Sequence, residues 1–81
     1  MKVKVVGVRC NMDFTTKEGS RIEGTSLHCV FPAPQTEDFE GETVDKIFLS
    51  KFKFPDVRIH AGDEVEFEFD RKGKVASYDI L

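Results

Sequence analysis

The fold class is decided by residues 64–80, EVEFEFDRKGKVASYDI. Apolar and acidic side chains alternate from Glu64 to Asp70, which is the period of a β-strand with one buried and one solvated face. Lys72-Gly73 then supplies a turn. With these two residues at its centre, each inward side chain meets an apolar partner across the hairpin: Val65 with Ile80, Phe67 with Tyr78, and Phe69 with Ala76.

The N-terminal part of the chain predicts a second, longer hairpin around Glu18-Gly19. That turn aligns apolar residues on the two strands: Val6 with Phe31, Val8 with Cys29, and Cys10 with Leu27. Met12 and Phe14 continue the same inner face toward the turn. The two cysteines, Cys10 and Cys29, are therefore expected to be buried thiols that pack as small apolar side chains.

Between the hairpins, residues 32–44 (PAPQTEDFEGETV) combine prolines with acids and predict a long, flexible, exposed loop. A third strand is expected at residues 46–50, running on through residues 51–54 until Pro55 ends the pairing. No window of the chain shows the apolar spacing of a helix.

Five strands in this order predict a single all-β domain over residues 1–81. The expected architecture is a small five-stranded Greek-key barrel, similar to the oligonucleotide-binding (OB) fold but without its usual helix. An SH3-like barrel fits the same strands nearly as well.

Composition favours a soluble intracellular protein. No apolar run approaches the roughly 18 residues that a membrane span needs, and the start MKVKVVGV is too short for the apolar core of a signal peptide. Two cysteines are too few for the disulfide framework of a small secreted domain. We therefore expect a cytoplasmic protein with no membrane partner.

Residues that could carry catalysis or bind a metal are sparse. The chain has no glycine-rich phosphate loop, nucleophile elbow or paired-His motif, so we assign no catalytic residue and expect neither an enzyme nor a cofactor. Zinc ligands could be sought among Cys10, His28, Cys29 and His60, but adjacent strand residues such as His28 and Cys29 point to opposite faces. The acidic residues of the 64–70 strand lie about 7 Å apart, which is too wide for one divalent cation.

The stretch 46–58 is the strongest binding signal in the sequence. Basic and aromatic residues interleave there: Lys46, Lys51, Lys53 and Arg58 with Phe48, Phe52 and Phe54. Single-stranded nucleic acid needs this combination, because cations neutralise phosphates and flat rings stack on bases. The alternative is that the three rings share one strand face and pack the core, while the lysines are solvated on the other face.

The charges are segregated along the chain, whose formal net charge is -3. Residues 1–21 carry five basic and two acidic groups and residues 46–62 carry four and one, whereas residues 22–45 carry six acidic groups and no basic one. A local basic surface can therefore attract phosphates in spite of the acidic balance. The acidic face of the last hairpin is expected to repel DNA.

Residues 13–24, DFTTKEGSRIEG, resemble the first hairpin of the filamentous-phage helix-destabilising proteins. Members of that family are small dimeric OB folds that coat single-stranded DNA, and in them a Phe-Thr-Thr-basic run precedes a glycine turn and a second basic residue. The similarity extends over most of the chain, through a Lys-Val start, a cysteine in the second strand and a closing strand after a glycine turn. Relatives of this kind are widespread in phages and mobile elements of Gram-positive bacteria.

The resemblance implies phosphate contacts at Lys17 and Arg21, which occupy the positions of the family's basic residues around this turn. Shortly after the second glycine the family has a base-stacking aromatic residue. This chain has Thr25-Ser26-Leu27-His28 there, so the family's aromatic residue has no counterpart, and His28 is expected to stack only weakly in its place.

These observations predict a non-enzymatic, sequence-tolerant single-stranded-DNA-binding protein of a phage or mobile element, acting in DNA replication as a homodimer, with RNA as the alternative polymer. The residues expected to contact phosphates are Lys17, Arg21, Lys46, Lys51 and Lys53, and those expected to contact bases are Phe52, Phe54 and His28. The alternative is a protein-binding adaptor or regulatory barrel that presents a strand edge and the acidic 37–45 loop to a basic protein partner. A third reading is an accessory domain of an enzyme that does no chemistry itself.

Overall fold

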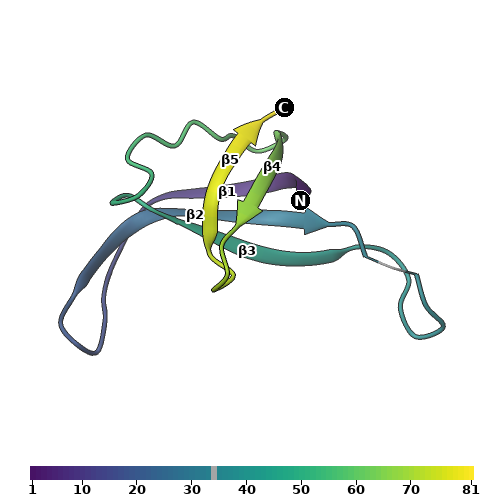
Figure 1. Ribbon diagram of the computed structural model, residues 1–81, viewed down its shortest axis with the longest axis horizontal. Helices are drawn as coiled ribbons and strands as arrows, with labels where there is room; N and C mark the ends of the chain where they lie inside the picture. The colour runs from purple at the N-terminus through teal and green to yellow at the C-terminus, as the bar shows by residue number, and fades with distance from the viewer. Residues whose placement is uncertain (34) are drawn as a thin grey trace.

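The computed structural model describes residues 1–33 and 35–81 and shows one antiparallel sheet of five strands (Figure 1). The strands are β1 (Lys2–Thr15), β2 (Arg21–Phe31), β3 (Thr43–Ser50), β4 (Glu64–Phe69) and β5 (Val75–Ile80). They lie side by side in the order β3-β2-β1-β4-β5. The described residues form no helix, and so none that could cross a membrane. The all-β prediction with five strands is confirmed.

The β4–β5 hairpin has the predicted register over most of its length. Val65 pairs with Ile80 and Phe67 with Tyr78. Only the end near the turn differs, because a register shift after Glu68 sets Phe69 opposite Val75 rather than Ala76. Gly73 takes a positive φ of 80° in the turn, a backbone conformation that glycine adopts without strain.

The register predicted for β1 and β2 is wrong, because the turn is displaced by one residue, so that Thr15 pairs with Arg21, and because β1 contains two irregularities. The pairing shifts between Val5 and Gly7 and again between Arg9 and Met12, where Asn11 has a φ of 58°. Each shift places an extra residue on β1, as a β-bulge does. The observed pairs that replace the predicted ones are Val5 with Cys29, Val8 with Leu27, and Phe14 with Ile22.

The bulges also change which residues of β1 face the core. Val3 and Val5 are buried, whereas Val6 is 49% exposed and the Cys10 thiol lies at the surface. The prediction of two buried cysteines therefore holds for Cys29 alone. Of the other residues assigned to the inner face, Val8 and Met12 are half-buried and Phe14 is exposed.

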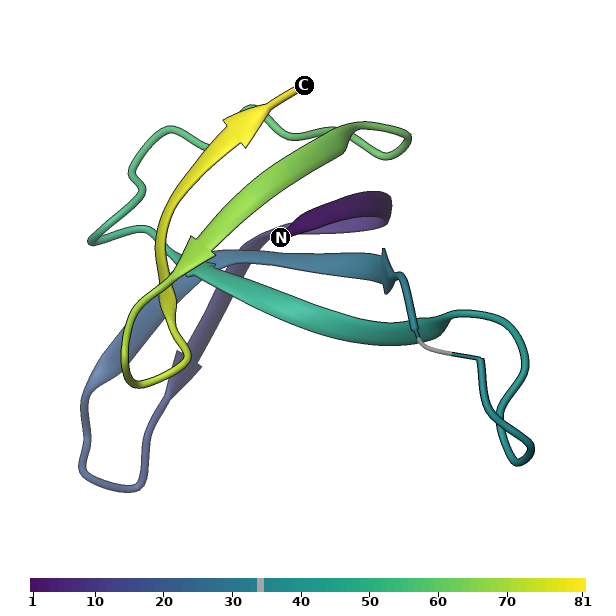
Figure 2. The ribbon, with the colours of Figure 1, turned by 45° about the vertical axis from the view of Figure 1, so that its right-hand side comes forward.

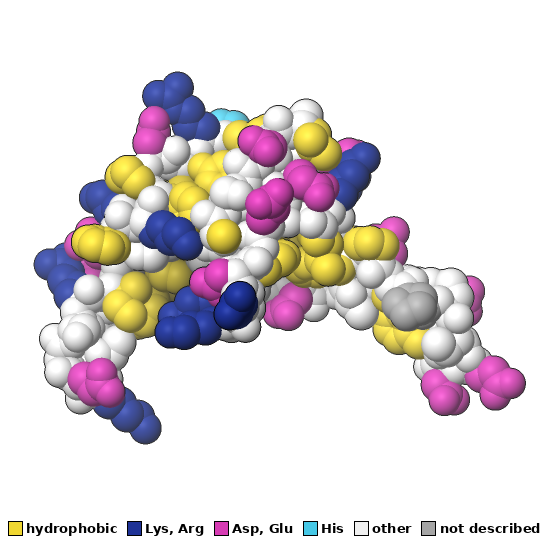
Figure 3. Space-filling model, viewed as in Figure 1, with side chains coloured by type: hydrophobic (Ala, Val, Ile, Leu, Met, Phe, Trp, Pro, Cys, Tyr) yellow, Lys and Arg dark blue, Asp and Glu magenta, His cyan; other side chains and the backbone are white. Residues whose placement is uncertain are grey.

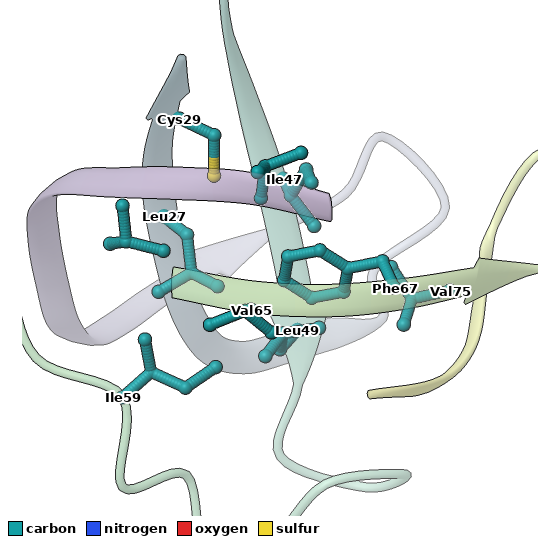
Figure 4. Close-up of a cluster of buried hydrophobic side chains, with 10 residues drawn as sticks. Leu27, Cys29, Ile47, Leu49, Ile59, Val65, Phe67 and Val75 are labelled. Atoms are coloured by element: carbon teal, nitrogen blue, oxygen red, sulfur yellow. The ribbon is translucent and has the colours of Figure 1, made fainter. Parts of the chain in front are cut away.

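The core is a cluster of small and medium apolar side chains around the ring of Phe67 (Figure 4). It draws on all five strands and on Ile59 in the connection before β4. Its members are Val3, Val5, Leu27, Cys29, Ile47, Leu49, Ile59, Val65, Phe67 and Val75. Burial of each of the larger side chains contributes about 1.5–3 kcal/mol to the stability of the fold. This burial is the main interaction that stabilises the sheet.

The third strand is longer than predicted at its start and shorter at its end. It begins at Thr43, so the acidic loop covers residues 32–42, and Pro34 of that loop lies outside the described residues. The side-chain amide of Gln35 donates to the carbonyl of Gly41 at 2.8 Å and accepts the Gly41 N–H at 3.0 Å. Residues 51–53 form a turn and do not continue the strand.

The sheet is not closed, so the predicted barrel, whether OB-like or SH3-like, is not confirmed. Within the described residues β3 pairs with β2 alone and β5 with β4 alone, which leaves both as edges. The ammonium of Lys53 donates to the carbonyl of Val75 at 2.8 Å and links the end of β3 to the start of β5. From there β3 diverges from the hairpin, as Figure 2 shows.

Candidate nucleic-acid interface

The turn that follows β3 presents an aromatic ring to solvent. The N–H of Phe54 donates to the carbonyl of Ser50 at 2.7 Å, and the N–H of Phe52 donates to the Ser50 hydroxyl at 3.2 Å. These two bonds fold the chain back over four residues, so that Phe52 lies at the outer side of the bend. Its side chain is 99% exposed.

The alternative in which all three aromatic residues of the 46–58 stretch pack the core required their rings to lie on one strand face. The three rings do not share one face. Phe54 is half-buried against the core, with its ring centroid 5.4 Å from that of Tyr78. Phe48 is 37% exposed and its ring lies over Gly24, where an added Cβ would stand 2.5 Å from the ring. Phe52 is therefore the ring of this stretch that is open to a ligand, and Phe54 has a structural role.

Lysines flank the exposed ring on both sides in the sequence. The ammonium of Lys51 lies 3.7 Å from a carboxylate oxygen of Glu23. The ammonium of Lys53 lies 5.6 Å from the centroid of the Phe54 ring while it donates to Val75. Both residues are exposed, and the Lys51–Glu23 pair is a surface ion pair of the weak kind that a phosphate can replace.

A second basic turn lies next to the first, and the sequence reasoning missed it. The Lys53–Val75 bond brings the 51–53 turn to the turn between β4 and β5, which carries the cations Arg71, Lys72 and Lys74. The acidic alternation of β4 had led us to expect that this hairpin repels DNA. The signal available in the sequence was three basic residues around the single glycine of that turn. Figure 3 shows basic side chains over this turn, beside apolar surface.

The one carboxylate within this second turn is engaged by the backbone. Asp70 accepts the N–H groups of Lys72 and Lys74 at 2.8 and 2.9 Å. The backbone N–H of Lys74, followed by that of Lys72 and the nearby Lys53 and Lys74 charges, holds the pKa of Asp70 below its ordinary value. The carboxylate is thus committed to shaping the turn.

Arg21 is brought close to Phe52, but two acids compensate its charge. Arg21, Lys51 and Phe52 line one shallow hollow of about 500 Å³. The guanidinium binds Asp13 with two nitrogens and lies 3.2 Å from Glu23. The hydrogen bond from Arg21 lowers the pKa of Asp13, and the same bond raises that of the guanidinium.

Two of the expected site residues lie apart from the exposed ring. Lys17 is exposed at the tip of the β1–β2 turn, which projects from the body of the sheet (Figure 2). His28 is half-buried in the middle of β2, opposite Lys46, whereas the ladder places Gly24 opposite Ser50 at the turn. Four residues along a strand span about 13 Å, so His28 does not join the Phe52 ring.

Lys46 lies in an open groove of about 1160 Å³ between β3 and the β4–β5 turn. The other cations that line this groove are Lys53 and Lys74. Its apolar lining includes Phe31, Val44, Ile47, Phe48, Phe69 and Val75. The groove therefore separates the two edge strands at the place where a closed barrel would join them.

The described residues contain no group of three or more His, Cys, Asp or Glu side chains placed to hold a metal ion. Cys29 is buried in the core, and desolvation followed by the charge of Asp45 raises the pKa of its thiol. Such a thiol stays protonated and reacts slowly.

Comparisons of this chain with protein-family models, with curated proteins and with solved structures find no match.

Proposed function

We propose that the protein binds single-stranded DNA, with single-stranded RNA as the alternative polymer, through the 51–53 turn and the adjoining β4–β5 turn. The observation that carries the proposal is the ring of Phe52, which is 99% exposed between two lysines. A fully solvated phenylalanine gains no stability for the fold, whereas a stacked base contributes about 1–3 kcal/mol to binding.

Cations on both turns supply the phosphate contacts in this proposal. They are Lys51 and Lys53 on the first turn, Arg71, Lys72 and Lys74 on the second, and Lys46 in the groove between the strands. Contacts to phosphates carry no sequence information, and stacking tolerates any base. The expected binding is therefore tolerant of sequence.

The biological setting rests on the resemblance of residues 13–24 to the filamentous-phage helix-destabilising proteins. Within the proposal, the protein is a non-enzymatic factor of a phage or mobile element that acts in DNA replication as a homodimer in the cytoplasm. Lys17 and Arg21 belong to the same surface if the strand extends along the β1–β2 arm.

The test is the binding of a fluorescent oligo-dT at low salt by the wild type and by Phe52→Ala. We expect the substitution to weaken binding by about 5- to 150-fold, which corresponds to the loss of one stacked base. Stability in urea should not change, because the side chain makes no buried contact. Val6→Ala, which truncates an exposed apolar side chain on β1, is the matched control and should bind like the wild type.

Two results would contradict the proposal. One is the absence of binding by the wild-type protein at low salt. The other is binding by Phe52→Ala that equals that of the wild type and of the Val6→Ala control, because the exposed ring would then have no part in the interaction.

A further inference from the structure

The edge of β3 is built to accept another strand. Its eight residues pair with β2 in an uninterrupted ladder from Phe31 opposite Thr43 to Gly24 opposite Ser50, with no bulge. Edge strands of stable proteins are normally blunted by bulges, prolines or cover from a loop, because a regular edge offers a row of backbone donors and acceptors. Over the described part of the chain, β3 has neither a bulge nor a proline, and its charged residues are the adjacent pair Asp45 and Lys46. The Asp45 carboxylate accepts the Lys46 N–H at 2.7 Å, a local bond that an added strand must replace.

Side chains next to this edge form an unfilled apolar surface. Val44 is 68% exposed and Phe48 37% exposed on one side of the strand, while Ile47 on the other side is at the margin of the core. Across the groove stands Phe69, which is 40% exposed. A strand laid along β3 would cover Val44 and the groove side of Ile47 and Phe69, whereas the Phe48 ring lies over Gly24 on β2, away from the free edge.

The charged side chains that line the groove are three lysines and two acids, which leaves a net positive charge. Lys46 projects from the middle of β3, and Lys53 and Lys74 line the facing wall of the groove. The two acids of the groove are engaged locally, because Asp45 accepts the N–H of Lys46 at 2.7 Å and Asp70 accepts two turn amides. No ion pair is found for the ammonium groups of Lys46 and Lys74 among the described residues.

We propose that β3 binds an extended segment of a partner protein in which apolar and acidic residues alternate, and that this segment adds to the sheet as a sixth strand. Backbone hydrogen bonds to the β3 edge supply affinity in this mode, and side chains at alternate positions supply specificity. The apolar residues of the segment lie in the groove beside Ile47 and Phe69. Its acidic residues meet Lys46 and Lys74.

A strand fits this edge better than a nucleic acid does. A sugar-phosphate backbone has acceptors and no regular donors, so it leaves the carbonyl groups of β3 without partners. A polypeptide satisfies the donors and the acceptors of the edge together. This site shares Lys46, Lys53 and Lys74 with the proposed nucleic-acid surface but does not include the exposed ring of Phe52. Its existence does not depend on the nucleic-acid proposal.

The probe is a blocked heptapeptide, Thr-Val-Glu-Ile-Glu-Val-Thr, added to isotopically labelled full-length protein and followed by amide NMR. We expect saturable binding and slowing of exchange by about tenfold or more at alternate amides of Thr43–Ser50, which are the amides that point away from β2. A peptide with both glutamates replaced by lysine should bind about tenfold more weakly. Methylation of the peptide's backbone nitrogens should abolish binding.

Two variants test this site; Lys46 and Lys74 belong to both proposed surfaces, whereas Phe52 belongs to the nucleic-acid surface alone. The double variant Lys46→Glu, Lys74→Glu should prefer the lysine peptide over the glutamate peptide, and that reversal shows that the variant is folded. Phe52→Ala should bind the glutamate peptide like the wild type. The proposal is overturned by binding that leaves the β3 amides unprotected, by equal affinity for the two peptides, or by no binding at millimolar peptide.

Discussion

At the scale of single residues, Arg21 is the site residue whose role depends most on its neighbours. It lies beside Phe52 and Lys51, yet its guanidinium is held by Asp13 and Glu23. An arginine with two carboxylate partners must exchange them for a phosphate, so it adds little net attraction for an anionic polymer.

Neutralising the carboxylates of Asp13 and Glu23 should free the Arg21 guanidinium to bind a phosphate. The double variant Asp13→Asn, Glu23→Gln is expected to bind oligo-dT about three- to tenfold more tightly than the wild type at low salt. The matched control is Glu37→Gln, Asp38→Asn, which changes the net charge equally in the 32–42 loop. Fluorescence anisotropy measures both, and equal gains in the two variants would show that only the overall charge matters and that Arg21 is outside the binding surface.

The fold requires a residue without a side chain at position 24, which is Gly24. A Cβ at this position would stand 2.3 Å from the carbonyl oxygen of Leu49 and 2.5 Å from the ring of Phe48. Because the closer atom belongs to the backbone of β3, it cannot turn aside as a flexible side chain does. Gly24→Ala should therefore lower the free energy of unfolding in urea by about 1–3 kcal/mol.

Gly7→Ala is the comparison for this substitution, because its Cβ would meet His28 at an ordinary 3.4 Å. We expect a loss well below that of Gly24→Ala. Equal stability of Gly24→Ala and the wild type would mean that β3 can move away from β2 without cost, and the close packing of these two strands would then be an incorrect description.

Prediction from sequence succeeded and failed at this scale for identifiable reasons. The exposed ring of Phe52 and its flanking lysines could be proposed from the interleaved basic and aromatic residues. The sequence could not predict that Phe52 is exposed while Phe54 is half-buried, because a period of two puts both rings on one face of a continued strand. The turn that separates the two rings is held by two hydrogen bonds to Ser50. Lys51-Phe52-Lys53 contains no residue of the types that predict a turn.

At the scale of elements, the β4–β5 turn combines a structural acid with a binding surface. Asp70 organises the turn through the N–H groups of Lys72 and Lys74, and its pKa is lowered below the ordinary 3.8. A carboxyl whose pKa is lower in the folded state stabilises the fold above the unfolded value. That stabilisation is lost as the pH falls through the folded value.

Asp70→Asn keeps a side-chain acceptor and removes the titration. The wild type should therefore exceed the variant in stability at neutral pH, and the difference should shrink as the pH falls below about 4. Urea denaturation of both proteins at a series of pH values measures this difference. The Asp13 carboxyl titrates in both proteins and cancels in the comparison. A difference that does not vary with pH would show that the Asp70 charge contributes nothing to the turn.

The two hairpins differ in whether the alternation of apolar and polar residues predicts the register of their strands. The register of β4 and β5 followed from the alternation, since a slip of one residue would have moved every apolar residue to the wrong face. The register of β1 and β2 did not follow. The turn lies one residue away from the predicted centre, and bulges at Val6 and Asn11 shift the pairing further. Val5, Val6 and Val8 allow more than one apolar alignment. Pattern alone had no means of choosing between these alignments.

At the scale of the whole molecule, the local sequence pattern determines the pairing of strands within a hairpin but does not determine whether the sheet closes into a barrel. Strand pairs within a hairpin are set by adjacent sequence, whereas closure of a barrel needs β3 to meet β5, which lie more than twenty residues apart. In the described residues no β3–β5 backbone ladder forms, and the segment after β3 meets β5 through the Lys53–Val75 bond and the ring contact of Phe54 with Tyr78. An apolar groove with lysines at its margins lies between the two edge strands. The groove of the proposed strand-binding site results from this opening, whereas the exposure of Phe52 results from the turn at Ser50.

The distribution of charge over the molecule determines how salt affects binding. The formal net charge is -3, but the acids of the 32–42 loop lie at the end of an arm that projects away from the β4–β5 turn (Figure 3). Charges separated by more than about 10 Å are largely screened at 0.1 M salt. Near the bound strand, the local cations therefore matter more than the net charge.

We expect the logarithm of the oligo-dT affinity to fall linearly with the logarithm of salt concentration, with a slope of about -2 to -3.5 for three to five neutralised phosphates. Neutralising the loop acids (Glu37→Gln, Asp38→Asn, Glu40→Gln, Glu42→Gln) should raise affinity at low salt and leave it unchanged above about 0.1 M, because distant acids act only through the unscreened field. Replacing Arg71 and Lys72 by glutamine should instead make the slope less negative by about 1.4. Anisotropy titrations at four salt concentrations measure all three proteins. A slope near zero for the wild type, or an unchanged slope in the Arg71, Lys72 variant, would place the phosphates elsewhere than on these two turns.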